Sequence, residues 1–347
     1  MSATDPSAEL AVGAEVRERV AWLDLSDAQE GFARGVDADA PYYVAGQTGM
    51  EYRRFLLLRL AYPQRDIPAP PLLDRYWRLH GADRSKFTSD CETLVAGTGV
   101  SAGSLAPPPQ PCEHPPGPQV RDLYEAIFPC GDADLWGWPK LEHDQRNSAP
   151  GMGSVHLRLP SAIDEPTRAA LRDEAFEQRG SATEYHCETA SVDGRGSVSS
   201  GGRYCSAGSG PLLHDAHWKG SVSRLIRAET GAIVAPTGAG YLYHRSGDSM
   251  GLHTDPYGCE LVLLTLLSGP VEPLHCYLDL ADTPFEEIHS LAQATSGLPD
   301  GATPFEISAV PFLFSGQRIP HHRKPAQRDN EAVVLVEFFG SLLPSSA

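Results

Sequence analysis

The stretch YLYHRSGDSMGLHTD, residues 241–255, joins a strand-like segment, a turn and a His-x-Asp pair. Aromatic and apolar residues beginning at Tyr241 are typical of a β-strand, and the Gly-Asp step that follows indicates a turn. His253 and Asp255 are two residues apart, and residues at this spacing along a strand point to the same face. The stretch therefore predicts a strand end that presents an imidazole and a carboxylate together.

Short strand-like segments surround this stretch from Ala232 onward. They are separated by turn residues, as in a jelly roll or a small barrel. The segments read AIVAP, GYLYHR, ELVLLTLL, LHCYLDL, VPFLFSG and AVVLVEFF. Two helical patterns, IDEPTRAALRDEAFEQRG and SVSRLIRAETG, come before them. We expect a mainly β core with flanking helices over residues 121–347.

The N-terminal part has a different texture. Residues 1–98 are predicted to be a helical region, in which TGMEYRRFLLLRLAYP places Thr48 and Glu51 at the spacing of a capping box before an apolar stripe. Residues 99–120, GVSAGSLAPPPQPCEHPPGPQV, are rich in Pro, Gly and Ser. This composition favours a linker or long surface loop over a helix or strand.

Composition excludes some partners. The 347 residues include 28 Lys and Arg against 45 Asp and Glu, a net charge of -17 that disfavours nucleic acid and anionic membranes. No apolar run is long enough to span a bilayer, and the N-terminal residues lack the pattern of a secretory signal. Seven scattered cysteines suit reduced thiols. We expect a cytoplasmic protein that binds neither nucleic acid nor a membrane.

A second histidine source lies far along the chain, in GQRIPHHRKP, residues 316–325. One imidazole from this segment, added to His253 and Asp255, would place two histidines and one carboxylate on a triangular face of an octahedral metal. The opposite positions would stay open, an arrangement that suits non-haem Fe(II). Zinc can also bind such a set and promote a hydrolysis.

These motifs resemble those of the Fe(II)- and 2-oxoglutarate-dependent oxygenases, whose fingerprint is His-x-Asp followed by a distal His. The resemblance covers roughly residues 220–340 and rests on YLYHRSGDSMGLHTD and LFSGQRIPHHRKP. It implies a double-stranded β-helix (a cupin-like jelly roll), Fe(II), 2-oxoglutarate as cosubstrate and O2. It also implies release of succinate and CO2 as a small organic molecule is oxidised. Because related halogenases have Gly or Ala in place of Asp255, the resemblance implies hydroxylation, desaturation or cyclisation.

The third ligand is assigned through the same resemblance. Family members often have proline four positions after the distal histidine, and Pro325 stands at that distance from His321. His321 is therefore the predicted ligand, with His322 as the alternative on the opposite face of the strand. Arg323 is expected to face inward with His321.

The cosubstrate anchor departs from the family pattern. The family places an Arg or Lys nine or ten positions after the distal histidine, where this chain has Asn330 and Glu331. No Lys or Arg occurs between Thr254 and Gln317 either. Because an arginine fork suits a carboxylate, the candidate anchors are basic residues elsewhere, in order Arg323 and Arg328, then Arg318 and Arg245. Tyr243, with Tyr241, is a candidate hydrogen-bond donor to the cosubstrate.

Two further alternatives stay open at this point. A cupin-like metal dioxygenase or isomerase that uses no 2-oxoglutarate would explain the missing anchor. A non-catalytic jelly-roll binding protein would make the motif accidental. Single histidines such as His244, His275 and His289 are expected to have core or surface roles.

Overall fold

The structure is a computed structural model of the chain. It describes residues 12–36, 41–111, 116–128, 135–136, 154–187, 202–219, 221–256, 258–284, 287–288, 290–291, 298–327 and 331–342. Arg328 and His289, both singled out in the sequence, lie outside the described residues. Within the described part of the chain, no helix is long and apolar enough to cross a membrane.

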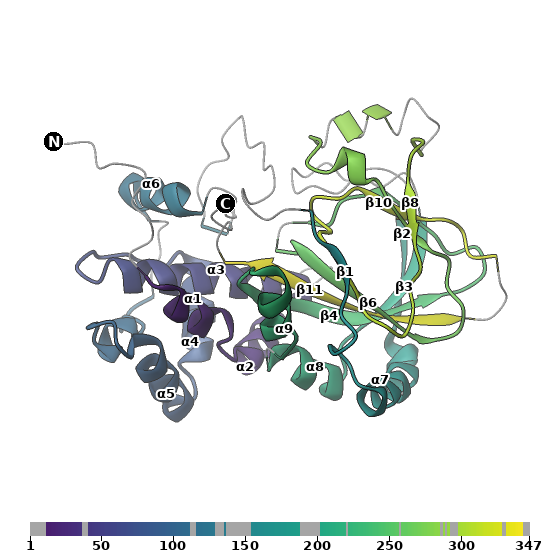
Figure 1. The fold of residues 1–347 in the computed structure, drawn as a ribbon. Coiled ribbons are helices and arrows are strands. Elements are labelled where there is room, and N and C mark those ends of the chain that lie inside the picture. The colour runs from purple at the N-terminus through teal and green to yellow at the C-terminus, as the bar shows by residue number, and fades with distance from the viewer. Residues whose placement is uncertain are drawn as a thin grey trace.

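Helices make up the N-terminal part of the molecule (Figure 1). They pack around α3, whose Tyr52 and Phe55 are fully buried against Tyr76 and Trp77 of α4. Prolines at the first turns of α4 and α6 suit the fixed backbone angle of a helix start. The elements are α1 (Ala14–Ala21), α2 (Ser26–Ala33), α3 (Pro41–Ala61), α4 (Pro71–His80), α5 (Arg84–Val95), the 3₁₀ turn η1 (Ala102–Leu105) and α6 (Pro118–Ile127).

The segment expected to be a linker or surface loop packs in part on these helices. Leu105, in η1, is fully buried, and its carbonyl accepts a 2.9 Å hydrogen bond from Trp77 Nε1. Arg78 donates to the carbonyl of Pro108 at 3.0 Å. The described part of this segment includes η1 and the start of α6, and these contacts hold its backbone against the helical region.

The β-rich part consists of two antiparallel sheets with helices outside them. The large sheet has seven strands in the order β1 (His156–Arg158), β9 (Phe312–Phe314), β6 (Leu261–Ser268), β11 (Ala332–Ser341), β4 (Val234–His244), β3 (Gly202–Gly208) and β2 (Thr183–Cys187). The small sheet has four, in the order β5 (Met250–His253), β10 (His321–Arg323), β7 (Leu274–Cys276) and β8 (Thr303–Phe305). A mainly β core with flanking helices was predicted, and it is confirmed; the structure adds that the strands are antiparallel.

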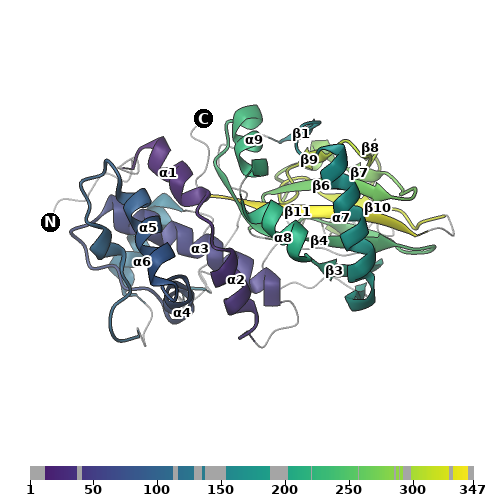
Figure 2. The ribbon, with the colours of Figure 1, turned by 90° about the horizontal axis from the view of Figure 1, so that it is seen from below.

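Both faces of the large sheet are buried. Its outer face is covered by α7 (Glu165–Gln178), α8 (Pro211–Trp218) and α9 (Ser221–Thr230), as Figure 2 shows. Its inner face packs on the small sheet through a shared apolar cluster that includes Val262, Leu264, Phe312, Phe314, Val334 and Val336, with Leu274 and Cys276 from β7. Successive residues of a strand therefore enter two different cores.

A buried polar network joins the helices to the end of the large sheet. Arg54 of α3 pairs with Glu51 at 2.8 Å and donates to the carbonyl of Ser341, on β11, at 2.9 Å. Glu51 also accepts hydrogen bonds from Tyr124 of α6 and, at 2.8 Å, from Trp136 Nε1. The contact of α3 with the yellow end of β11 is visible in Figure 1.

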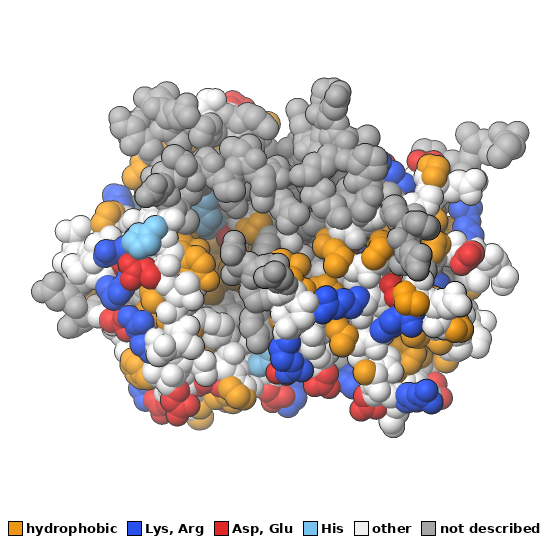
Figure 3. All heavy atoms as spheres, turned by 180° about the vertical axis from the view of Figure 1, so that it is seen from behind, with side chains coloured by type: hydrophobic (Ala, Val, Ile, Leu, Met, Phe, Trp, Pro, Cys, Tyr) orange, Lys and Arg blue, Asp and Glu red, His pale blue; other side chains and the backbone are white. Residues whose placement is uncertain are grey.

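Charges on the surface are mixed in sign. Figure 3 shows Lys and Arg side chains interspersed with Asp and Glu over the described part of one face. Several of these are local ion pairs, such as Arg34 with Glu30 at 2.6 Å. No broad basic patch is present on the described part of that face, in keeping with the net charge of -17.

Removing the centre of the buried network should destabilise the protein strongly. Glu51→Ala leaves the Arg54 guanidinium buried without its carboxylate, and we expect a loss of about 3 to 5 kcal/mol in the free energy of unfolding. Urea denaturation of the parent and the variant measures it. Glu30→Ala, which breaks an exposed pair of the same type, should cost less than about 1 kcal/mol. Equal effects of the two substitutions would contradict this account.

Candidate metal centre

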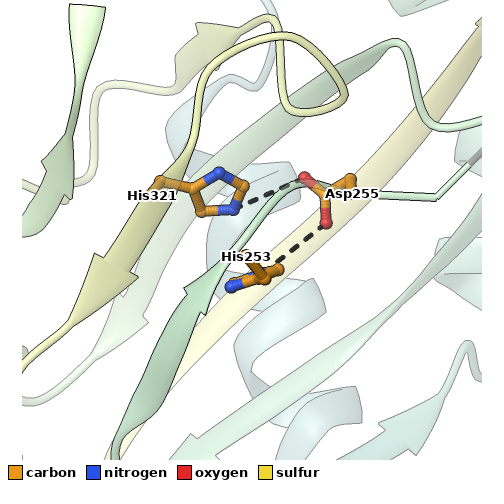
Figure 4. Close-up of side chains that lie close together, drawn as sticks. All are labelled: His253, Asp255 and His321. Atoms are coloured by element: carbon orange, nitrogen blue, oxygen red, sulfur yellow. Dashed lines mark ion pairs between the residues drawn. The ribbon is translucent and has the colours of Figure 1, made fainter. Parts of the chain in front are cut away.

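Three potential metal ligands meet at the end of the small sheet where β5 ends and β10 begins. His253 ends β5, Asp255 follows it in the loop, and His321 begins β10 directly opposite His253 in the antiparallel register. One ligand atom from each of the three lies within 4.8 Å of the others. Figure 4 shows both imidazoles directed at the Asp255 carboxylate, with Nε2–O distances of 3.9 Å for His253 and 3.5 Å for His321.

Backbone carbonyls fix the tautomer of both imidazoles. Nδ1 of His253 lies 2.8 Å from the carbonyl oxygen of Gly251, and Nδ1 of His321 lies 2.8 Å from that of Ile319. A carbonyl only accepts hydrogen bonds, so each Nδ1 carries the proton and donates it. Each Nε2 keeps its lone pair and faces Asp255. Orientation of a ligand histidine by a second hydrogen bond is usual at metal sites.

Gly316 lies directly against Asp255 and positions its carboxylate. The Asp255 amide donates to the Gly316 carbonyl at 2.9 Å. A side chain at 316 would not fit, because its Cβ would lie 2.1 Å from Asp255 Oδ2 and 2.5 Å from Val262 Cγ2. Oδ2 is buried and has no hydrogen-bond donor among the described residues. A buried carboxylate oxygen without a donor is costly, and a bound cation would satisfy it.

Burial also sets the protonation of the three groups. It lowers the pKa of His253 and of His321 to about 4 and raises the pKa of Asp255 to about 6. At neutral pH both imidazoles are therefore neutral, with Nε2 free to bind a metal. Two imidazole nitrogens and one carboxylate oxygen fit Fe(II) with open positions, and they also fit zinc.

The two adjacent residues of β10 point to opposite sides of the small sheet. His322 faces outward, where its ring stacks on His275 at 4.8 Å and approaches Tyr277 at 5.7 Å. Arg323 lies on the inward side with His321, is 3% exposed, and donates to Met250 Sδ at 2.9 Å. Of the two candidate histidines, only His321 is brought to His253 and Asp255.

The remaining predicted binding residues are not brought to this cluster. Tyr243 points to the outer face of the large sheet, where its hydroxyl donates to the Ala175 carbonyl of α7 at 2.6 Å. Arg318 is paired with Asp282. Arg245 is paired with Glu184 at 2.8 Å and with Asp248 at 3.4 Å.

The structure shows features of His244 and Gly316 that the sequence did not indicate. His244 alternates with Tyr243 on β4 and so faces the interior between the sheets. The signal in the sequence was this alternation, but it could not show which face is which. Gly316 was visible only as the glycine before the distal histidine segment, and its close approach to Asp255 needs the fold.

We expect Gly316→Ala to disturb the cluster without touching a ligand. The added methyl group must push the Asp255 carboxylate away, so Fe(II) affinity should fall by roughly 10- to 100-fold, as for other residues that orient a ligand. Anaerobic titration calorimetry with Fe(II) measures this. Gly208→Ala on β3 is the matched control, because its Cβ would meet no atom within 4 Å. Parent-like Fe(II) affinity in Gly316→Ala would show that Gly316 does not position the carboxylate.

The comparisons with known proteins give structural likenesses only. Neither family models nor curated proteins match the sequence. Among solved structures, a prolyl-4-hydroxylase from Pseudomonas putida is 11% identical, with 53% of this chain and 91% of that chain covered and a TM-score of 0.34. HygX from Streptomyces hygroscopicus, solved with nickel, 2-oxoglutarate and hygromycin B, is 12% identical, with 54% and 83% covered and a TM-score of 0.38. SnoK, a non-haem alpha-ketoglutarate-dependent carbocyclase from nogalamycin biosynthesis, is 13% identical, with 54% and 79% covered and a TM-score of 0.39.

An oxidoreductase of the 2OG-Fe(II) oxygenase family from Burkholderia pseudomallei is 14% identical, with 56% and 89% covered and a TM-score of 0.35. This is the class that the sequence motifs resemble. The chain also has a candidate His-Asp-His metal site. At these identities and TM-scores the likeness to solved structures assigns no activity to this chain.

Proposed function

We propose that the protein is an Fe(II)- and 2-oxoglutarate-dependent oxygenase that oxidises a small organic molecule in the interior of a double-stranded β-helix. The observation that carries the proposal is the cluster of His253, Asp255 and His321, with both Nε2 atoms and a buried carboxylate oxygen directed at one point. The open positions of such a centre suit a cosubstrate and O2.

In this proposal the three side chains hold the iron, and the protein controls what reaches it. Iron held there supplies the activation of O2, coupled to conversion of 2-oxoglutarate into succinate and CO2. His253 and His321 bind through Nε2 while their Nδ1 atoms stay hydrogen-bonded to the backbone. The apolar cluster between the sheets, including Phe314 at 4.9 Å from the His321 ring, limits access of water.

Arg323 is suited to bind the far carboxylate of 2-oxoglutarate. It lies two residues beyond His321 on the same face, an advance of about 6.6 Å along the strand that a five-carbon dicarboxylate can bridge. Its guanidinium is buried, and no described carboxylate forms an ion pair with it. Although burial lowers the pKa of Arg323 to about 9, the side chain is still cationic at neutral pH. A buried charge of this kind needs an anionic partner.

The substrate is proposed to be a small molecule, and the reaction to be hydroxylation, desaturation or cyclisation. Asp255 occupies the position that would have to be vacant for a halide ligand. Formation of a chlorinated product by the unmodified protein would contradict this part of the proposal.

Loss of any one ligand should remove the metal. We expect His253→Ala, Asp255→Ala and His321→Ala to abolish stoichiometric Fe(II) binding, because two protein ligands hold a divalent ion far more weakly than three. Anaerobic reconstitution followed by iron analysis measures it. His322→Ala is the matched control from the adjacent position and should retain most of the iron. If His321→Ala retained iron and His322→Ala lost it, the third ligand would be His322 and not His321.

The cosubstrate assignment is tested through succinate. Loss of a charge-assisted hydrogen bond costs on the order of 2 to 3 kcal/mol, so Arg323→Leu should raise the apparent KM for 2-oxoglutarate roughly a hundredfold. Fe(II) binding should stay close to that of the parent. Arg318→Leu, whose guanidinium is already paired with Asp282, should change the KM by less than about twofold. An iron-loaded parent that makes no succinate with or without candidate substrates would favour a cupin-like enzyme that uses no 2-oxoglutarate.

A further inference from the structure

His244 ends strand β4 with its side chain in the interior between the two sheets. Its neighbours on the strand show the direction. Tyr241 and Tyr243 point outward and bond to Glu174 and to the Ala175 carbonyl of α7, whereas Leu242 packs on the cluster between the sheets. Because side chains alternate along a strand, His244 faces inward with Leu242.

Nothing in the described part of the chain satisfies this imidazole. His244 is 2% exposed, and neither ring nitrogen has a hydrogen-bond partner among the described residues. Burial lowers the pKa of His244 well below its usual range, so the ring is neutral at pH 7 and carries one N–H donor. A buried donor without an acceptor destabilises a fold unless a ligand supplies the acceptor.

A second unsatisfied donor with an inward direction belongs to Arg323. Arg323 Nε is buried without a described partner. The positive charge of Arg323 also contributes to lowering the pKa of His244. Asp248, whose charge also acts on Arg323, is already bound by Arg203 at 2.8 Å and by the Arg245 amide at 2.9 Å.

Backbone hydrogen bonds hold the two donors at one end of the interior. The turn that follows His244 is bonded to the segment that follows Arg323. The Gly247 amide donates to the Ala326 carbonyl at 2.9 Å, and the Ala326 amide donates to the Asp248 carbonyl at 2.9 Å. These bonds join the segments that follow β4 and β10, so the inward side chains at the ends of the two strands belong to the same end of the interior.

We propose that His244 and Arg323 together form a carboxylate-binding recess, in which His244 donates a neutral hydrogen bond and Arg323 supplies the charge. The inference rests on the proposed function and deepens it, because it names His244 as a second residue that recognises the far carboxylate of the cosubstrate. The position of the recess beyond His321 matches the end of the cosubstrate that does not face the metal. This part of the site replaces the basic residue that the sequence lacks at positions 330 and 331.

The test separates the two ends of the ligand. We would measure binding of 2-oxoglutarate and of 2-oxopentanoate, which has a methyl group in place of the far carboxylate, to anaerobic Fe(II)-loaded protein by titration calorimetry. His244→Leu should weaken 2-oxoglutarate binding roughly tenfold while changing 2-oxopentanoate binding by less than about twofold. His244→Gln, which keeps an N–H donor, should recover part of the loss.

The thermal stability of the metal-free protein distinguishes a binding role of His244 from a structural one. A structural role predicts a lower melting temperature for His244→Leu, and a binding role does not. Because Leu has a volume similar to that of His and removes an unsatisfied polar group, the metal-free His244→Leu variant should melt at or above the temperature of the parent. Tyr243→Phe, the adjacent residue on the outer face, is the matched control. It should lose stability and keep parent-like binding of both ligands.

Four outcomes would overturn the inference. Equal weakening of both ligands by His244→Leu would place His244 at the metal end, and unchanged 2-oxoglutarate binding would remove it from the site. Parent protein that binds 2-oxoglutarate no better than 2-oxopentanoate would show that the recess does not bind the far carboxylate, while leaving the proposed function in place. Parent protein that binds neither ligand would overturn the proposed function, and this inference with it.

Discussion

The pairing of β5 with β10 is the constraint on which the site depends. This register sets His253 opposite His321 and leaves the loop after β5 to deliver Asp255 against Gly316. His253 and Asp255 are close in the sequence, but His321 is far from both. The antiparallel pairing of β5 with β10 is therefore what brings the three side chains together. A shift of one residue in β10 would turn His322 inward and move His321 and Arg323 to the outer face.

Backbone hydrogen bonds and an apolar interior surround this pair of strands. Several polar groups nevertheless lie in that apolar interior. The backbone carbonyls of Gly251 and Ile319 orient the two imidazoles, and the large sheet fills the interior with Val, Leu and Phe. The buried polar atoms without a hydrogen-bond partner in the described residues include Asp255 Oδ2, both ring nitrogens of His244, and Arg323 Nε. Their common location between the sheets favours a site that a metal and an anionic ligand complete.

The sequence correctly predicted which residues of one strand share a face. Residues two apart share a face, which correctly grouped His253 with Asp255 and Arg323 with His321. The same rule grouped Tyr241 with Tyr243, but the binding role expected for them required the inner face. Both faces of the large sheet are buried, one by helices and one by the small sheet, so apolar alternation does not mark the interior. A core or surface role was expected for His244, and its inward direction follows from the contacts of Tyr243 with α7 and of Leu242 with the cluster between the sheets.

Long-range packing was the other feature that the sequence did not contain. A Pro-rich composition indicated irregular backbone for residues 99–120, but whether such a segment crosses solvent or packs on helices depends on partners such as Trp77. Likewise, Glu51 and Thr48 have the spacing of a capping box, yet both lie inside α3, where Glu51 instead binds Arg54, Tyr124 and Trp136. A local pattern was present, and tertiary contacts gave the carboxylate a different role.

The two kinds of buried polar group in this molecule differ in a way that bears on function. The Glu51 network is closed, because its charges are matched within the chain and join α3 and α6 to β11. The recess at Arg323 and His244 is open, because its donors find no acceptor in the described chain. Closed networks specify a fold, whereas open ones cost stability until something binds. The chain therefore accepts this cost at the place where the proposed cosubstrate would supply the missing charge.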